Sequence, residues 1–237
     1  MIDAAVDDLY AAFARRPAPK RMDACPCCVR DDEVARLLPK PLSELCADDL
    51  GRYPFKAMST WGSEGDYAHF LPRILELVVR GEDAGLPGLA LEVVIRKMHD
   101  AGFEAWSEPE RSAVRGLFDA WADDVLSRPG DAIFWLEEAS PMLADPAAFV
   151  RRWAARPGAP RDIAEAMSQR WFGQGDFWSL EVPAGWRGTP ASGAALLALF
   201  RAPETQAAME RALSESDDAA LTAELAFALE MLELYRG

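Results

Sequence analysis

Short apolar segments with helical spacing, separated by proline and glycine, are the feature that most constrains the fold of this chain. The sequence has 237 residues, among them 17 prolines and 16 glycines. Between these breaks apolar residues recur every three or four positions, which is the spacing of a helix face. Alanine and leucine dominate, and strand-like alternation is nearly absent, so we predict an all-α fold.

The predicted helices are short and follow one another closely. Counting the segments between breaks gives about ten helices of roughly 10 to 20 residues each. Pairs of these helices recur at a spacing of about 40 residues, which is the period of armadillo and HEAT repeats. We therefore predict antiparallel pairs stacked into an α-α superhelix. The length suits one domain over residues 1–237, with a candidate subdivision near 128–131, where Arg128-Pro129-Gly130 interrupts a helix.

The segment from Asp49 to Arg80 combines the strongest helical pattern with the clearest start and stop signals. Its first part is predicted to be a helix ended by Gly62, with five residues on one face: Leu50, Tyr53, Ala57, Met58 and Trp61. Ser63 and Asp66 resemble a capping box, in which a hydroxyl and an acid satisfy the first amides of the next helix. Pro72 is expected to divide that next helix into a short turn and a new helix.

Charge and hydropathy exclude several classes of function. The chain has 25 basic and 39 acidic residues, a formal charge of −14, which repels a phosphate backbone and argues against nucleic acid. No basic run is longer than the pairs Arg15-Arg16 and Arg151-Arg152, and each of these is interpreted as a solvated helix end. The apolar runs are shorter than the ~20 residues that span a bilayer. The acidic start MIDAAVDDLY differs from a signal peptide, so we expect a cytoplasmic protein with reduced thiols.

The sequence Cys25-Pro26-Cys27-Cys28 is the sharpest chemical motif. Cys25 and Cys28 have the spacing that brings two thiolates to one zinc ion across a turn. A tetrahedral site needs two further ligands, for which Cys46 and His69 are the candidates, with Cys27 as a substitute. A zinc ion is thus the one cofactor that the sequence suggests. Two other interpretations compete: a redox pair of neighbouring thiols, and small buried side chains that pack a loop. The packing interpretation is favoured, because a second paired motif is missing.

His69 also suggests a general base. On a continuous helix it would share a face with Asp66 and Arg73, so a carboxylate would orient the imidazole and an arginine would hold an anion. The competing interpretation is a histidine in a polar cluster at a helix end, and it is favoured.

Three tryptophans are candidates for contact with a ligand or partner: Trp61, Trp178 and Trp186. Most tryptophans pack in cores. Trp178 and Trp186, however, fall in residues 173–190, a long segment without helical period, and long loops are often functional.

Three segments, MDACPCC, DLGRYPFKAMSTWG and DYAHFLPRILEL, resemble an uncharacterised family of bacterial proteins. The resemblance covers about the first third of the chain. It implies a bacterial cytosolic protein, and it contributes no catalytic residue.

The sequence contains no phosphate-binding loop, dinucleotide fingerprint, metalloprotease helix or nucleophile elbow. We therefore expect a helical scaffold that binds another protein without catalysis. The alternatives are a zinc protein or enzyme with its site near Cys25, Cys28, Cys46 and His69, and a small-molecule pocket between helices.

Overall fold

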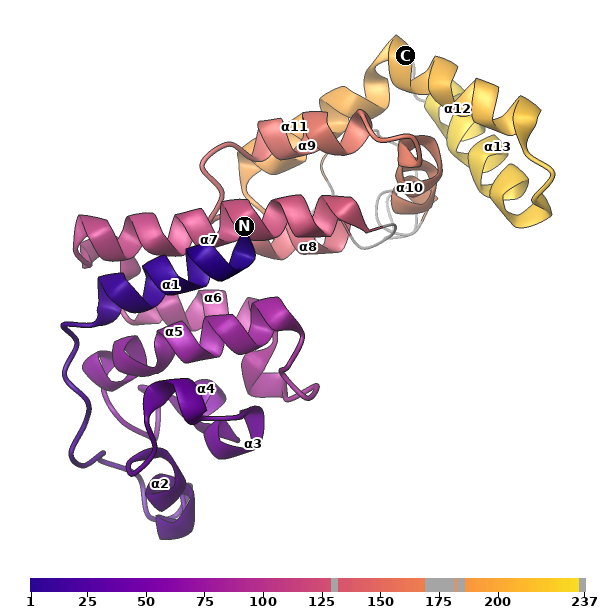
Figure 1. Cartoon of the computed structure of the whole chain (residues 1–237). Helices are drawn as coiled ribbons and strands as arrows, with labels where there is room; N and C mark the ends of the chain where they lie inside the picture. The colour runs from indigo at the N-terminus through magenta and orange to yellow at the C-terminus, as the bar shows by residue number, and fades with distance from the viewer. Residues whose placement is uncertain (129–131, 169–181, 183–185, 235–237) are drawn as a thin grey trace. The chain divides into compact units, whose positions relative to one another are not determined.

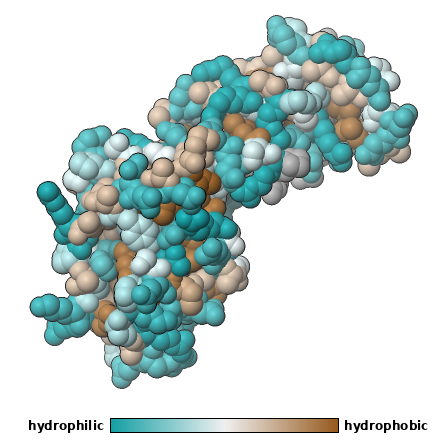
Figure 2. Space-filling view, in the orientation of Figure 1, coloured by the Kyte–Doolittle hydropathy of each residue, from teal (hydrophilic) through white to brown (hydrophobic). Residues whose placement is uncertain are grey.

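The computed structural model describes residues 1–128, 132–168, 182 and 186–234, and in these residues the protein is all-α, as predicted (Figure 1). The described residues form no β-strand; their only β-type pairings are isolated bridges between Ala24 and Trp61 and between Ala57 and Trp61. In the same residues, no helix has both the length and the apolar character needed to cross a membrane. On the face drawn in Figure 2, hydrophilic residues cover most of the surface, in keeping with the high content of charged residues.

The chain divides into two compact units, Met1–Trp121 and Ala122–Gly237. The division lies inside helix α7 (Glu108–Ser127), earlier in the chain than the break predicted at 128–131. The first unit contains the following further elements: α1 (Ile2–Phe13), α2 (Asp31–Leu37), η1 (Leu42–Glu44), α3 (Ala47–Leu50), α4 (Tyr53–Lys56), α5 (Glu64–Arg80), η2 (Pro87–Leu89), α6 (Leu91–Asp100) and η3 (Phe103–Ala105).

Helix α5 is the centre of the first unit. It contacts α1 and α6, which lie beside it in Figure 1. Ten of its residues are buried, distributed around most of the helix: Tyr67, Ala68, Phe70, Leu71, Pro72, Ile74, Leu75, Leu77, Val78 and Val79. A helix that is apolar on nearly all sides has to be surrounded by other elements. The predicted capping box is confirmed, since Asp66 N–H donates to Ser63 Oγ and Ser63 N–H donates to Asp66 Oδ2.

The second unit is also helical. Its elements are α8 (Ala132–Ala139), α9 (Pro146–Ala154), α10 (Ala159–Ala166), α11 (Pro190–Arg201), α12 (Pro203–Glu215) and α13 (Ala219–Leu234). Helix α9 packs on α11, and α13 packs on α10 and α12. Prolines stand in the first turn of α9, α10, α11 and α12, where the missing amide leaves no helical hydrogen bond unmade.

The segment before α5 differs from its prediction. In place of one helix up to Gly62, the chain forms the short helices α3 and α4 and then a tight turn at residues 57–61. Gly51 and Met58 have positive φ angles of 48° and 63°, which a continuous helix does not allow. The apolar spacing nevertheless identifies buried positions, because Leu50, Tyr53, Ala57 and Trp61 are all buried.

Candidate metal centre

A tight turn brings the three cysteines of the CPCC motif together. The N–H groups of Cys28 and Val29 both donate to the carbonyl oxygen of Cys25, each at 2.9 Å. Pro26 occupies the second position of this turn, where its fixed φ angle suits the geometry and its missing N–H is not needed. The local sequence therefore folds back on itself within four residues.

The three sulfur atoms form one cluster. Cys25 Sγ lies 2.9 Å from Cys27 Sγ, and Cys27 Sγ lies 3.6 Å from Cys28 Sγ. All three lie within 4.8 Å of one another, and all belong to free cysteines. Thiolates bound at ~2.3 Å to a tetrahedral zinc ion are about 3.8 Å apart, so only small side-chain movements separate this cluster from a ligand set. Cys27 is exposed and the other two are partly exposed, which leaves the sulfurs accessible from solvent.

The cysteine turn is attached to the turn that precedes α5. Cys25 N–H donates to Thr60 O at 2.8 Å, and Gly62 N–H donates to Asp23 O at 2.7 Å. These two bonds flank the antiparallel bridge between Ala24 and Trp61. The backbone at the start of the motif is thus fixed by partners more than thirty residues further along the chain.

The turn at residues 57–61 is itself fixed by contacts with buried residues of the first unit. The Trp61 ring is 2 % exposed and meets the Tyr53 ring edge-on, with 5.2 Å between centroids. Lys97 of α6 is buried and donates its Nζ to Ala57 O at 2.7 Å. Burial lowers the pKa of the Lys97 amine, because a charged ammonium loses its hydration there.

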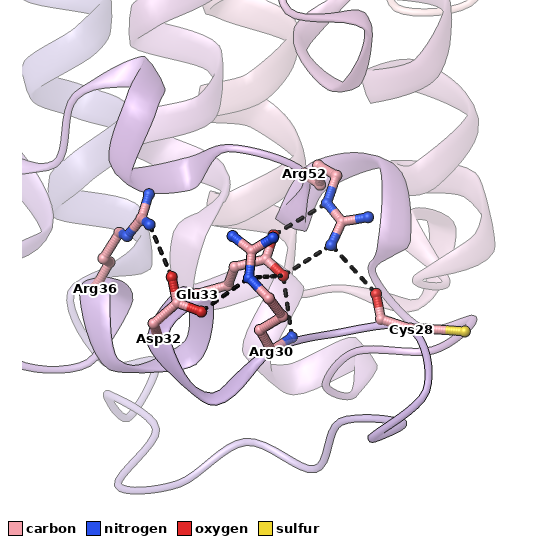
Figure 3. Close-up of polar contacts among 6 residues, drawn as sticks. All are labelled: Cys28, Arg30, Asp32, Glu33, Arg36 and Arg52. Carbon is pink, nitrogen blue, oxygen red and sulfur yellow. Dashed lines mark hydrogen bonds and ion pairs between the residues drawn. The ribbon is translucent and has the colours of Figure 1, made fainter.

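Arg52 fixes the other end of the motif (Figure 3). Its guanidinium donates to both carboxylate oxygens of Glu33, at 3.0 and 2.7 Å, and to Cys28 O at 3.3 Å. The hydrogen bond from Arg52 and that from the backbone N–H of Arg30 hold the pKa of Glu33 at about 2, below its usual 4.5. Figure 3 also shows the Cys28 sulfur directed away from the guanidinium, so Arg52 holds the backbone and leaves the sulfur open.

Cys25 and Cys27 lie within hydrogen-bonding distance of each other, and the contact shifts their pKa values in opposite directions. The hydrogen bond with Cys27 lowers the pKa of Cys25, whereas the same bond raises the pKa of Cys27 to about 11. Of the two sulfurs, Cys25 is therefore the one that loses its proton more readily. Thiolates are the form of cysteine that binds metals and attacks electrophiles.

The other two residues of the predicted zinc site do not join this cluster. Among the described residues, the only group of three or more Cys, His, Asp or Glu side chains close enough together to hold a metal ion is Cys25, Cys27 and Cys28, which includes neither Cys46 nor His69. Cys46 precedes α3, and its thiol donates to Asp49 Oδ2 at 3.2 Å. The structure thus pairs Cys25 and Cys28 with Cys27, which the sequence suggested only as a substitute ligand.

The predicted His69 cluster shares a helix but not a hydrogen-bond network. Helix α5 is continuous, so Asp66, His69 and Arg73 do lie at helical spacing. Asp66, however, caps the helix through Ser63, and Arg73 donates to Leu45 O at 2.6 Å. The His69 ring lies edge-on to Phe70, and burial lowers the pKa of the imidazole. The three side chains do not assemble a general base, and His69 lies in the second turn of α5 beside an aromatic ring, not at a helix end.

The candidate tryptophans have different surroundings. Trp61 is buried in the core of the first unit and presents no face to a ligand. Trp186 is half-buried, and its indole N–H lies 3.3 Å from both Thr189 O and Ser192 Oγ at the start of α11. Trp178 lies outside the described residues.

A groove of about 670 Å³ lies between α1 and α7, within the first unit. It is lined mainly by small residues, among them Ala4, Ser112 and Gly116, and Asp8 is its only ionisable side chain. The groove could therefore enclose a small molecule, but it lacks the convergent polar groups that would orient one.

Sequence reasoning missed the residues that hold the motif in place. Arg52 and Thr60 bond to the backbone of the cysteine turn, and Lys97 bonds to the backbone of residues 57–61, to which that turn is attached. Contacts between residues far apart in the chain produce no local spacing pattern that the sequence could reveal. The unusual burial of Lys97 follows from its place on the apolar side of α6, next to Met98 and Val94, which a helical projection of the sequence does show.

Together the fold and the cluster define a class: an all-α protein with three solvent-accessible cysteines on one anchored turn. No family model, curated protein or solved structure matches this chain. The function is therefore argued from the site.

Proposed function

We propose that the protein binds one thiophilic metal ion, zinc in the first instance, through Cys25, Cys27 and Cys28. The observation that carries this proposal is the convergence of three free sulfurs within 4.8 Å on a single turn. Thiolate ligands favour zinc and Cu(I) over the hard ions Mg²⁺ and Ca²⁺. The proposal narrows the ligand set expected from the sequence to the three cysteines of the motif.

The surroundings of the sulfurs support this role. The Thr60 carbonyl, the Gly62 N–H and the Arg52 guanidinium fix the backbone on both sides of the motif, so the ligands need little ordering when an ion binds. Arg52 also places a positive charge near the motif, which helps to balance three thiolates around a divalent ion. Three protein ligands leave one position of a tetrahedral ion for water or for an outside ligand.

Zinc titration of the reduced, metal-free protein tests the proposal, with a chromophoric chelator as competitor. We expect one zinc ion per chain. Cys27→Ser and Cys28→Ser should each weaken binding by at least about tenfold, as loss of a ligand contact typically does. Cys46→Ser is the matched control, because its thiol bonds to Asp49 outside the cluster, and it should bind zinc like the parent.

Two outcomes would overturn the assignment. Binding that survives Cys27→Ser unchanged would remove Cys27 from the ligand set. A loss of affinity in Cys46→Ser equal to that in Cys28→Ser would return Cys46 to it. Circular dichroism of each variant shows whether the helical fold is intact.

The expectation that the helical surface binds another protein stays a prediction, because a fold alone does not specify a partner.

A further inference from the structure

Two of the three sulfurs are already close to bonding distance. Cys25 Sγ and Cys27 Sγ are 2.9 Å apart, and a disulfide bond is ~2.05 Å long. The pair needs only a side-chain movement of about 0.9 Å to reach that length, by subtraction of the two distances. Cys27 and Cys28 are 3.6 Å apart and adjacent in sequence, so a bond between them would close a strained eight-membered ring.

The pair is also reachable. Cys27 is exposed and Cys25 is partly exposed, so a small oxidant in solution meets both sulfurs without any opening of the fold. The hydrogen bonds at Cys25 and Gly62 join backbone atoms and involve neither sulfur.

From this geometry we propose that Cys25 and Cys27 are an oxidation site, which hydroperoxides convert into a disulfide that no longer holds a metal ion. One thiolate attacks the peroxide, so that the O–O bond breaks, an S–OH group forms and a hydroxide or alkoxide leaves with the electron pair. The second sulfur then attacks the S–OH sulfur, and water leaves. In total two S–H bonds and one O–O bond are lost, and one S–S bond and two O–H bonds are gained, so the sulfurs are oxidised and the peroxide is reduced to water and a second molecule of water or an alcohol.

The consequence for the site is direct. The disulfide removes two of the three thiolates and leaves Cys28 as the sole cysteine ligand, which is too few to retain zinc. This second step rests on the proposed function, whereas the formation of the disulfide does not. A dithiol reductant reverses the reaction and restores the ligand set.

The first experiment uses the full chain, reduced and free of metal, with hydrogen peroxide as the oxidant. We expect the four thiols per chain to fall to two, in a monomer with unchanged helix content. Trypsin releases residues 22–30 as one peptide, MDACPCCVR, which contains all three cysteines. After alkylation of the remaining thiols, fragmentation should place the label on Cys28 and the disulfide between Cys25 and Cys27.

Variants make this result specific. Cys28→Ser should still lose two thiols, and Cys46→Ser should behave like the parent. In Cys27→Ser, which lacks one sulfur of the pair, the rapid loss of two thiols to hydrogen peroxide should be absent. The proposal is overturned by a label on Cys27 with a bond between Cys25 and Cys28, by dimers linked through disulfides, or by sulfinic acid formed without any disulfide.

A second experiment adds peroxide to zinc-loaded protein and follows released zinc with a chromophoric chelator. One zinc ion should be released for each disulfide formed, and a dithiol reductant should restore binding. If the protein binds no zinc, the proposed function fails while the first experiment still decides the oxidation site. If the disulfide forms and zinc stays bound, the link between oxidation and release is wrong.

Discussion

Gly62 joins the cysteine turn to helix α5, and its position suits only glycine. Its φ angle is +71°, in the left-handed region. A Cβ atom there would lie 2.9 Å from Met22 Cε and 3.0 Å from Asp66 Oδ2. Its N–H donates to Asp23 O beside the cysteine motif, so any strain at Gly62 is transmitted to the site.

We expect Gly62→Ala to lower the free energy of unfolding by about 1–2 kcal/mol, the cost of a left-handed alanine. It should also weaken zinc binding, because the Gly62–Asp23 bond holds the motif. Gly116→Ala is the control: Gly116 is an exposed residue of α7, and a Cβ there meets no atom within 4 Å. That change should stabilise the protein by about 0.5–1 kcal/mol.

Urea denaturation and zinc competition measure the two effects. Equal effects of the two alanines on stability would contradict the strained role of Gly62. A loss of stability without any change in zinc affinity would show that the motif holds its shape independently of this bond.

At the residue scale, the sequence identified the right motif and the wrong partners. Cys25 and Cys28 were recognisable from their spacing, because a short turn needs no information from elsewhere. The surroundings of Arg16 could not be recognised in this way. The sequence suggested a solvated helix end, but Arg16 makes an ion pair with the buried Glu110 through two hydrogen bonds of 2.6 and 3.0 Å. Long-range partners of this kind depend on tertiary packing, which single residues do not encode.

At the scale of elements, helix α2 depends on a charged contact with the start of α4. Glu33 is the third residue of α2 and accepts hydrogen bonds from the Arg30 backbone and from Arg52, the residue before α4. Its pKa of about 2 lies below the usual 4.5, so the folded protein favours the charged form. The stabilisation is complete above the unfolded pKa and is lost as the pH falls from about 4.5 toward 2.

Glu33→Gln should therefore be less stable than the parent near neutral pH, and the difference should shrink as the pH falls from 5 toward 2. Denaturant unfolding in a chelating buffer, at several pH values, measures this difference without a contribution from metal. Asp31→Asn changes an exposed acid in the same turn of α2 and should show a much smaller difference. A Glu33→Gln difference that is independent of pH would mean that the charge of Glu33 does not contribute to stability.

Helix boundaries followed the sequence where caps are local and departed from it at proline. The capping acid Asp66 accepts a hydrogen bond from the Ser63 N–H, as the sequence suggested. Pro72 was expected to divide a helix, yet α5 is continuous from Glu64 to Arg80. An internal proline costs ~3 kcal/mol. The many buried side chains of α5 outweigh that cost, and burial of this extent is a property of the packed unit.

At the scale of the whole molecule, composition and periodicity predicted the all-α class, because helical spacing repeats along most of the chain. The division into units was less accessible. Pro129 and Gly130 are residues at which a helix can end. The boundary between the two compact units, however, lies between Trp121 and Ala122. Helix α7 continues across that point, so its sequence pattern shows no break there. The stacked superhelix stays a prediction.

The described residues that hold the cysteine turn, either directly or through residues 57–61, all lie within the first unit: Arg52, Thr60, Gly62 and Lys97. We therefore expect a fragment of residues 1–128, which keeps α7 whole, to unfold cooperatively and to bind zinc with the affinity of the full chain. Circular dichroism during heating and zinc competition measure these two properties.

The matched control is a fragment of residues 1–107, which lacks α7. It loses Glu110, the partner of Arg16, and the fully buried side chains of Val114 and Phe118. It should fail to unfold cooperatively and should bind zinc more weakly, because the turn would then lack a folded core to hold it. If residues 1–107 failed to fold and still bound zinc as tightly as residues 1–128, the four-residue turn would be a sufficient site by itself. The anchoring by Arg52, Thr60 and Lys97 would then serve the fold and not the metal.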